Sequence, residues 1–236
     1  MTEIGGPAPA VAVVIPAYNP GAYLSAAVDS VIAQSLSDWE CVVVDDGSTE
    51  DLTWVEQVDT RVRLVRQVNC GLACARNRGI TETRAPLIAF LDADDLWLPE
   101  KLATQVAAIN TEGTDLVSTT FSFIDDGGNL QGPGYSSSAK TYEELLRGNG
   151  ICASSVLVRR VTFVAAGAFD DRLRRVEDWD AWLRLVAMGG KLTHVGQVLA
   201  LYRVHSGNMT KNYRANCAAS LRVLSRHLAP AIRSGD

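Results

Sequence analysis

Two groups of acidic residues end apolar segments of this sequence. The pair Asp45-Asp46 follows an apolar segment that ends at Val44, and Asp92-Ala93-Asp94 follows another that ends at Leu91. Such segments are typical of buried parallel strands. Because ligands of open α/β sheets bind beyond the carboxyl ends of the strands, we expect these carboxylates to line a ligand cleft. The second group suits a hard divalent cation that takes few oxygens from the protein and the rest from a substrate diphosphate.

The composition is ordinary for one globular domain. At 236 residues the chain can form one substantial core, and 47% of its residues are hydrophobic. The net charge of −5 disfavours nucleic acid as a partner. The five cysteines form no metal-binding pattern, so we expect reduced thiols in a cytoplasmic protein. The polar opening of the chain is unlike a signal peptide, and Arg159-Arg160 interrupts the longest candidate for a membrane span, Ile151–Phe169.

Strands alternate with helices through the first half of the sequence. This order predicts an α/β sheet with right-handed crossovers and helices on both faces. The second half is less regular, and its stretch rich in Gly and Ser, Asp125–Lys140, predicts a mobile surface loop. The expected strands are Val11–Ile15, Trp39–Val44, Val62–Gln67, Leu87–Leu91, Asp115–Phe123, Ser154–Arg159, Leu192–Val195 and Val198–Val204, and the expected helices are Gly21–Gln34, Leu52–Asp59, Gly71–Thr83, Pro99–Asn110, Tyr142–Arg147, Val161–Ala166, Asp178–Met188 and Asn216–Leu228.

Six motifs follow one another in an order that is typical of one enzyme family. They are Val13–Asn19, Val43–Thr49, Asn69–Asn77, Phe90–Asp95, Glu177–Asp180 and Tyr202–His205. With them the chain resembles the family 2 glycosyltransferases, inverting enzymes of the GT-A fold that use nucleotide sugars. The resemblance implies an α/β fold with a mainly parallel central sheet flanked by helices. The Gln-x-x-Arg-Trp motif of processive synthases is absent, which implies transfer of one sugar per encounter.

The resemblance also implies how the chain is divided. It predicts a single domain over residues 1–236, with a nucleotide-binding half at about 10–125 and an acceptor-binding half at about 126–210. A C-terminal helix is expected at about 214–229.

The resemblance places the nucleotide in the first half of the chain. It implies that the turn after the first strand packs against the nucleobase, and that Asp46 accepts a hydrogen bond from an imide N–H, which favours a UDP- or dTDP-sugar. Arg76 lies one turn into a helix opened by Gly71, where its guanidinium either contacts the nucleotide or pairs with the clustered aspartates. The nucleotide-binding residues expected in this way are Pro16, Ala17, Tyr18, Asn19, Asp46, Arg76, Asp92 and Ala93.

Asp92-Ala93-Asp94 resembles the metal-binding DxD motif of the family. The resemblance implies that Asp94 binds Mg²⁺ or Mn²⁺ on the donor diphosphate and that Asp92 supports the ribose or a metal-bound water. Such a cation neutralises the charge that develops on the leaving group. His205 follows the last strand and either reaches the metal or the diphosphate or has a structural role.

Asp178 is the residue for which the resemblance implies the role of catalytic base. It stands at the start of a helix, where ordinary capping explains an acid equally well. An inverting mechanism needs one carboxylate on the acceptor side to take the proton of the attacking hydroxyl. Beside it, Glu177 and Trp179 are expected to contact the acceptor, with a core position as the alternative for Trp179.

The C-terminal segment is basic and amphipathic. From Arg203 onward its charged residues are cationic except for Asp236, and Leu221, Leu224 and Leu228 share one helical face. Such a helix either packs on the domain or lies on an anionic membrane. We therefore expect a cytoplasmic protein, with peripheral contact to the inner face of the cytoplasmic membrane as the alternative to a packed helix.

Together these features predict an inverting, metal-dependent transferase that moves one sugar from a nucleotide-diphosphate sugar to a sugar or a lipid-linked glycan. We expect it to act in the biosynthesis of cell-surface polysaccharides or glycoconjugates. A nucleotidyltransferase is one alternative, although Pro16–Gly21 contains none of the basic residues that its phosphate-binding loop would need. A non-catalytic nucleotide-sugar binding module is another, and turnover distinguishes it from an enzyme.

Overall fold

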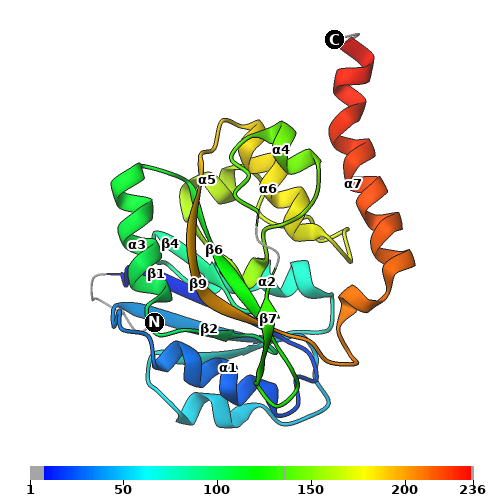
Figure 1. Ribbon diagram of the computed structural model, residues 1–236. Coiled ribbons are helices and arrows are strands. Elements are labelled where there is room, and N and C mark those ends of the chain that lie inside the picture. The colour runs from blue at the N-terminus through cyan, green and yellow to red at the C-terminus, as the bar shows by residue number, and fades with distance from the viewer. Residues whose placement is uncertain (1–7, 135–136, 235–236) are drawn as a thin grey trace.

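The strands of the computed structural model form one mixed sheet (Figure 1). The structure describes residues 8–134 and 137–234, and within them eight strands lie in the order β3-β2-β1-β4-β8-β6-β9-β5, while a ninth, β7, pairs with β6. The strands are β1 (Val11–Ala17), β2 (Trp39–Asp45), β3 (Val62–Arg66), β4 (Leu87–Phe90), β5 (Leu96–Trp97), β6 (Leu116–Ile124), β7 (Leu130–Pro133), β8 (Val156–Arg159) and β9 (Leu192–Arg203).

Parallel pairing dominates the sheet. β1 pairs in parallel with β2 and β4, β2 pairs in parallel with β3, and β9 pairs in parallel with β6 along most of its length. β8 is antiparallel to both β4 and β6. The mainly parallel sheet confirms the predicted α/β class, and the antiparallel β8 joins its two parallel parts.

Helices cover both faces of the sheet. Alternate residues of β1 divide between two hydrophobic cores: Val11, Val13 and Ile15 pack in the core that contains α1 and α3, whereas Val14 packs in the core that contains α2, α5 and α6. This period of two is that of a strand covered on both faces. The helices are α1 (Tyr23–Ile32), η1 (Thr53–Gln57), α2 (Leu72–Glu82), α3 (Lys101–Glu112), α4 (Tyr142–Leu146), η2 (Ala153–Ser155), α5 (Arg160–Ala165), α6 (Glu177–Ala187), η3 (Met209–Lys211) and α7 (Tyr213–Ser234).

A glycine allows α2 to pack directly on β1. A Cβ atom at Gly79 would collide with the side chain of Val14, so no larger residue fits at this position. Arg76 lies one turn earlier on the same helix and is buried. The close packing of α2 therefore holds the Arg76 side chain at the carboxyl ends of the central strands.

The structure differs from the sequence-based expectations in several elements. The two strands expected at Leu192–Val195 and Val198–Val204 form one strand, β9, because shifts of register against β6 keep the pairing continuous between them. The helix expected at Leu52–Asp59 is only the short η1, since Val55 is its sole buried residue and little apolar surface sustains it. The short strand β7 lies in the predicted loop Asp125–Lys140, whose residues 135 and 136 lie outside the described part.

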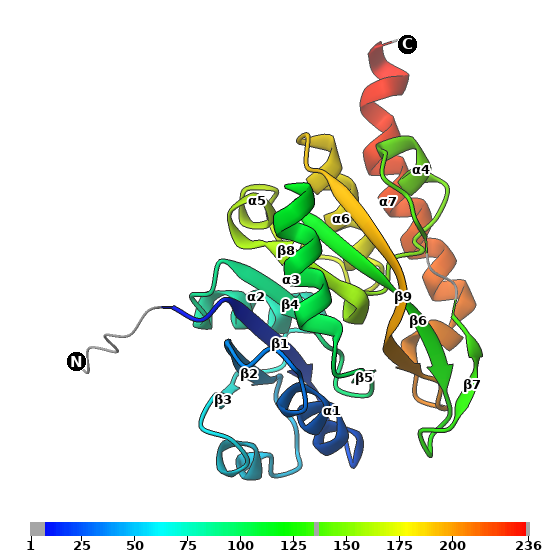
Figure 2. The same ribbon diagram turned by 60° about the vertical axis from the view of Figure 1, so that its left-hand side comes forward.

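The C-terminal helix α7 runs beside α4 and α6, and its end extends beyond the other elements (Figure 2). It is longer than expected. Val223 on one face is buried, and Tyr142 of α4 donates a hydrogen bond to the carbonyl of His227 at 3.2 Å. On another face Tyr213 and Leu221 are 77% and 64% exposed. The helix thus packs by one face only. Among the described residues, no helix combines the length and the apolar character that a membrane span requires.

Candidate active site

One large cavity opens at the carboxyl ends of β1, β2 and β4. Its volume is about 1390 Å³, and both halves of the sequence contribute to its lining. Pockets for a single small ligand usually measure about 300–1,000 Å³. The cavity therefore has room for two reactants, and all the site residues expected from the sequence line it.

Two hydrogen-bonded turns form the end of the cavity next to β1 and β2. Asn19 follows β1 with a φ of 45°, a left-handed conformation that Asn adopts more readily than most residues. Its Oδ1 accepts a hydrogen bond from the N–H of Thr49 at 2.8 Å, and its own N–H donates to Oγ of Ser48 at 2.9 Å. These bonds hold the turn that follows β1, in which Tyr18 is 57% exposed. Pro16 and Ala17, expected in this turn, are the last residues of β1. An exposed ring on a fixed turn is suited to stacking against a flat ligand.

Asp46 is buried at the end of β2 and holds the loop that precedes α2. Its Oδ1 accepts hydrogen bonds from Nε2 of Gln67 at 2.7 Å and from the N–H of Cys70 at 2.9 Å, and its Oδ2 accepts one from the N–H of Gly71 at 2.8 Å. A carboxylate offers about four lone-pair positions. One position on Oδ2 is therefore left for a ligand.

Two of the five cysteines are not the reduced thiols that we expected. Cys70 and Cys74 form a disulfide, with their Cα atoms 5.8 Å apart. Gly71 begins α2 with a φ of 97°, so the chain turns into the helix directly after Cys70 and brings Cys74 beside it one turn later. The bond ties the loop held by Asp46 to the first turn of α2. The other cysteines are free thiols: Cys41, Cys152 and Cys217.

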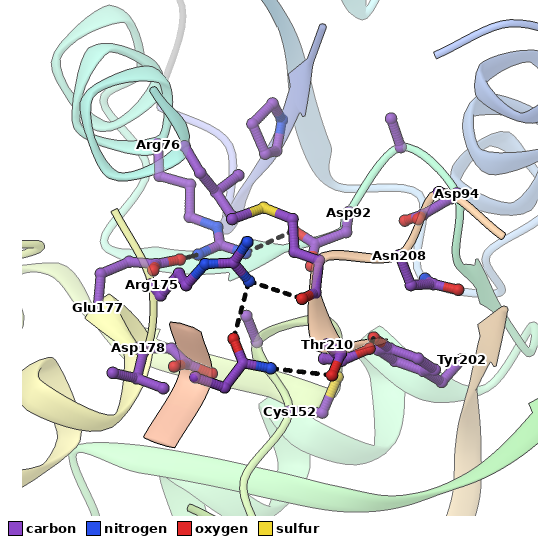
Figure 3. A pocket seen from close by; sticks show the side chains of 18 of the residues that line it. Arg76, Asp92, Asp94, Cys152, Arg175, Glu177, Asp178, Tyr202, Asn208 and Thr210 are labelled. Atoms are coloured by element: carbon purple, nitrogen blue, oxygen red, sulfur yellow. Dashed lines mark hydrogen bonds and ion pairs between the residues drawn. The ribbon is translucent and has the colours of Figure 1, made fainter. Parts of the chain in front are cut away.

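Arg76 lies at the centre of the site and joins its two sides (Figure 3). Its Nη1 pairs with Oε1 of Glu177 at 2.7 Å, and its Nη2 pairs with Oδ1 of Asp92 at 2.5 Å. Burial alone lowers the pKa of Arg76, but the carboxylates of Asp92 and Glu177 raise this pKa above its ordinary value. The structure thus shows the pairing with carboxylates, and it places Glu177 on Arg76. Contact of Arg76 with a nucleotide and of Glu177 with an acceptor remain predictions.

Asp94, in the same loop as Asp92, forms a second pair with His205 at one corner of the cavity. Oδ2 of Asp94 lies 2.9 Å from Nε2 of His205, and the N–H of Gly207 donates to Nδ1 of the same ring at 3.2 Å. Because a backbone N–H can only donate, Nδ1 is an acceptor and Nε2 carries the proton that Asp94 accepts. Burial, followed by the charge of Asp92, raises the pKa of Asp94.

Asp95 holds the loop that carries the two other aspartates. It is buried, accepts a hydrogen bond from Oγ of Ser154 at 2.5 Å, and accepts another from the N–H of Arg203 at 2.9 Å. The guanidinium of Arg203 in turn donates to the carbonyl of Asp94 at 2.8 Å. Neither Asp95 nor Arg203 is among the site residues expected from the sequence. The signal that points to Asp95 is a third acid directly after the Asp92-Ala93-Asp94 group.

The donor atoms at this corner fit a divalent cation that arrives with a phosphate ligand. No group of three or more His, Cys, Asp or Glu side chains in the described part of the chain forms a complete metal site. Mg²⁺ usually takes one or two carboxylates and completes its shell with substrate phosphates and water. Asp92 and Asp94 supply such carboxylates, and His205 holds Asp94 by a hydrogen bond. Ligation of a metal by His205 itself would require its ring to give up one of its two hydrogen bonds, and it stays a prediction.

Asp178 faces the cavity from the first turn of α6. Its Oδ1 accepts hydrogen bonds from Nδ2 of Asn149 at 3.0 Å and from the N–H of Trp179 at 2.7 Å. Its Oδ2 accepts no hydrogen bond from the described residues. Burial and the charge of Glu177 raise the pKa of Asp178 to about 6, although Arg76 acts in the opposite direction. A carboxylate with a free oxygen and such a pKa is suited to accept a proton near neutral pH.

The first turn of α6 is fixed at both ends. Val176 precedes it with a φ of 51°, a left-handed conformation that is rare for a β-branched residue. Such residues persist where the surrounding structure holds them, often at functional sites. Trp179 is only 4% exposed, and its Nε1 donates to the carbonyl of Leu145 at 2.8 Å. Trp179 thus occupies the core position that the sequence analysis left open, and Val176 gave no sequence signal.

Comparison with known proteins finds a matching family and several relatives. A model of the family described as Glycosyl transferase family 2 matches residues 12–162. An uncharacterized glycosyltransferase of Nostoc is 33% identical over 212 residues, which are 84% of this chain and 66% of that protein. TuaG of Bacillus subtilis, named as a candidate teichuronic acid biosynthesis glycosyltransferase, is 30% identical over 86% of this chain and 82% of its own length.

A third relative carries a more specific name. WfaP of Escherichia coli, a UDP-Glc:alpha-D-GlcNAc-diphosphoundecaprenol beta-1,3-glucosyltransferase, is 29% identical over 86% of this chain and 80% of its own length. Among solved structures, residues 1–349 of Staphylococcus aureus TarS match with a TM-score of 0.74 at 17% identity. The match covers 92% of this chain and 65% of that one, and it shows the same fold. TarS has also been solved with UDP and with UDP-GlcNAc.

Proposed function

This chain belongs to glycosyl transferase family 2, and on that premise we propose that it is an inverting transferase that moves one sugar from a UDP- or dTDP-sugar to an acceptor hydroxyl. The environment of Asp178 is the observation that carries the proposal. Its free Oδ2 faces a cavity large enough for donor and acceptor together, and its pKa is raised to about 6. The carboxylate is therefore ionised at neutral pH and still basic enough to take a proton.

The proposed reaction is a single displacement at the anomeric carbon. The acceptor oxygen attacks this carbon while Asp178 takes the proton of the acceptor hydroxyl. The bond between the anomeric carbon and the diphosphate oxygen breaks on the opposite side, and its electron pair leaves with the nucleoside diphosphate. General-base help of this kind is worth roughly 10²–10⁴-fold in rate. The Arg76–Glu177 pair and the bond from Asn149 hold the base in place.

Asp46 is the proposed reader of the nucleobase. The lone-pair position left on its Oδ2 can accept one N–H, and the imide of uracil or thymine supplies one. Adenine and cytosine carry no imide N–H. The exposed ring of Tyr18 lies on the adjoining turn and is proposed to stack on the base.

Asp94 and Asp92 are proposed to hold Mg²⁺ or Mn²⁺ on the donor diphosphate. Such a cation, when bound, neutralises charge on the leaving group. Arg76 orients Asp92 and His205 orients Asp94, so both carboxylates are in position before a ligand arrives.

The proposed acceptor is a sugar carried on a lipid diphosphate, in the synthesis of a cell-surface polysaccharide or glycoconjugate. The names of WfaP and TuaG support this assignment. Such acceptors lie in a membrane, and α7 offers a surface that suits one. Tyr213, Leu221 and Leu228 are exposed on it, and neither Arg214 nor Arg222 belongs to an ion pair among the described residues. We propose that this face lies on the anionic cytoplasmic leaflet.

A panel of nucleotide sugars tests the proposed function. The enzyme is incubated with each sugar and Mn²⁺, with and without a short-chain lipid-diphosphate sugar, and release of nucleoside diphosphate is measured. We expect UDP or dTDP to be released, and Asp178→Asn to abolish the part that depends on the acceptor. Release of pyrophosphate from a nucleoside triphosphate and a sugar phosphate would instead indicate a nucleotidyltransferase.

A further inference from the structure

Three cations in the cavity form no ion pair with the described residues. Four Lys and Arg side chains line the cavity, and Arg76 alone among them takes part in an ion pair in the described part of the chain. Arg174, Arg175 and Lys211 do not, although five carboxylates line the same cavity. Cations left unpaired in an acidic cavity are available to an anionic ligand.

Arg175 contacts the short helix η3, which ends at Lys211 (Figure 3 shows Arg175). Nη1 of Arg175 donates to the carbonyl of Met209 at 2.6 Å and to Oδ1 of Asn216 at 2.8 Å. Lys211 is the last residue of η3, which begins at Met209. Nε and Nη2 of Arg175 make no hydrogen bond with the described residues, so its other edge can bind an anion.

Arg174 belongs to the other side of the cavity. Its Nη1 donates to the carbonyl of Cys70, in the loop that Asp46 holds. The donor diphosphate is assigned to the corner of Asp92 and Asp94. Arg175, by contrast, contacts η3 and Asn216 in the first turns of α7.

We infer that Arg175 and Lys211 form a second phosphate-binding subsite, which takes the diphosphate of an acceptor that carries an apolar chain. This inference rests on the proposed function. The planar guanidinium matches two phosphate oxygens, and the ammonium adds a second charge. Tyr213 begins α7 two residues after Lys211 and is 77% exposed, so an apolar chain that leaves the subsite meets an exposed aromatic ring on the helix proposed to lie on the membrane.

Binding measurements in EDTA test the subsite without turnover. The probes are inorganic pyrophosphate, farnesyl diphosphate, farnesol and, in a separate arm with Mn²⁺, UDP. For the wild type we expect farnesyl diphosphate to bind more tightly than pyrophosphate, and farnesol to bind weakly. Arg175→Gln and Lys211→Gln should each weaken farnesyl diphosphate binding by about tenfold or more, as expected for a hydrogen bond to a charged group. The affinity for UDP with Mn²⁺ should change less than about twofold.

Two control variants separate charge from structure. Arg84→Gln removes an exposed cation that does not line the cavity, and it should bind every probe like the wild type. Asn216→Ala removes a hydrogen-bond partner of Arg175 and no charge, and it should keep most of the farnesyl diphosphate affinity.

Three results would overturn the inference. Equal loss of affinity in Asn216→Ala and Arg175→Gln would make Arg175 a structural residue. Loss of UDP affinity in Arg175→Gln and Lys211→Gln, with farnesyl diphosphate unaffected, would assign the two cations to the donor. Equal binding of farnesol and farnesyl diphosphate would mean that no anion is recognised. Failure of the proposed function would appear separately, as absence of sugar transfer with every donor.

Discussion

Replacing Asp178 by Asn should abolish transfer and at the same time stabilise the protein at neutral pH. The folded protein raises the pKa of this carboxyl from its ordinary 3.8 to about 6. The native state therefore binds the proton more tightly than the unfolded chain, and the ionised form weakens the fold. The difference is about 2 pKa units, which at about 1.4 kcal/mol per unit is roughly 3 kcal/mol as an upper limit.

The sign of the effect follows from the direction of the shift. Well below pH 3.8 the carboxyl is protonated in both states, and wild type and Asp178→Asn should be equally stable; at pH 4 they should still differ little. As the pH rises from 4 to 6, the wild type alone loses stability, because only its native state resists ionisation. Above pH 6 the variant should therefore have a free energy of unfolding up to about 3 kcal/mol greater.

Urea unfolding at pH 4 and pH 8, with product formation measured at pH 8, tests this expectation. Transfer should fall by about two orders of magnitude or more. Asp180→Asn is the matched control on the same helix. Although burial acts to raise the pKa of Asp180, hydrogen bonds from His227 and Arg184 lower this pKa overall. Its ionised form therefore stabilises the fold, and Asp180→Asn should lose stability at pH 8. A variant at position 178 that is less stable than the wild type at pH 8, or that transfers sugar within a few-fold of it, would refute the reasoning.

Four further predictions address the pH dependence, the nucleotide, the metal and the membrane. In a plot of kcat/KM against pH, the acid limb should have its midpoint near pH 6. Glu177→Gln should move this midpoint to lower pH, because the charge of Glu177 raises the pKa of Asp178, and an unmoved midpoint would contradict this. UDP and dTDP should raise the melting temperature more than ADP and CDP at matched concentration, and equal shifts would remove the base-reading role of Asp46. EDTA, reversibly, and Asp94→Ala should nearly abolish turnover, whereas full activity in EDTA would disprove the metal assignment. The protein should sediment with anionic liposomes at low salt and be released at high salt, and Leu221→Asp should reduce sedimentation. Absence of sedimentation at low salt would favour an α7 that packs on the domain and does not bind a membrane.

The sequence was sufficient for the parts of the fold that depend on local patterns. Apolar strands covered on both faces, such as β1, appear as unbroken runs because every residue is buried. Asp46 and Asp92 were found because an acid directly after such a run lies at the ligand edge of the sheet. The short strand β5 was missed because two residues are too few to show the alternating pattern of a strand. It is defined by its pairing with β9.

The contacts that set the chemistry were beyond the reach of such patterns. Arg76 and Glu177 are 101 residues apart in the sequence, and neither neighbourhood indicates that the two side chains meet. The disulfide was missed because the spacing of Cys70 and Cys74 becomes a contact only once Gly71 turns the chain into α2. The left-handed Val176 has no sequence signal at all, since other residue types adopt that conformation far more readily.

The pKa of Asp178 shows why these contacts matter for function. Capping at a helix start would stabilise the ionised form and lower the pKa, so a capping role alone predicts a carboxylate that is a poor base. Burial and Glu177 overcome that tendency, while Arg76 limits the rise. Because Arg76 pairs with both Glu177 and Asp92, the same guanidinium joins the neighbour of the proposed base to the corner assigned to the donor diphosphate. A motif can therefore point to a carboxylate as the proposed base, but the pKa of that carboxylate depends on groups that the fold brings together from α2 and α6.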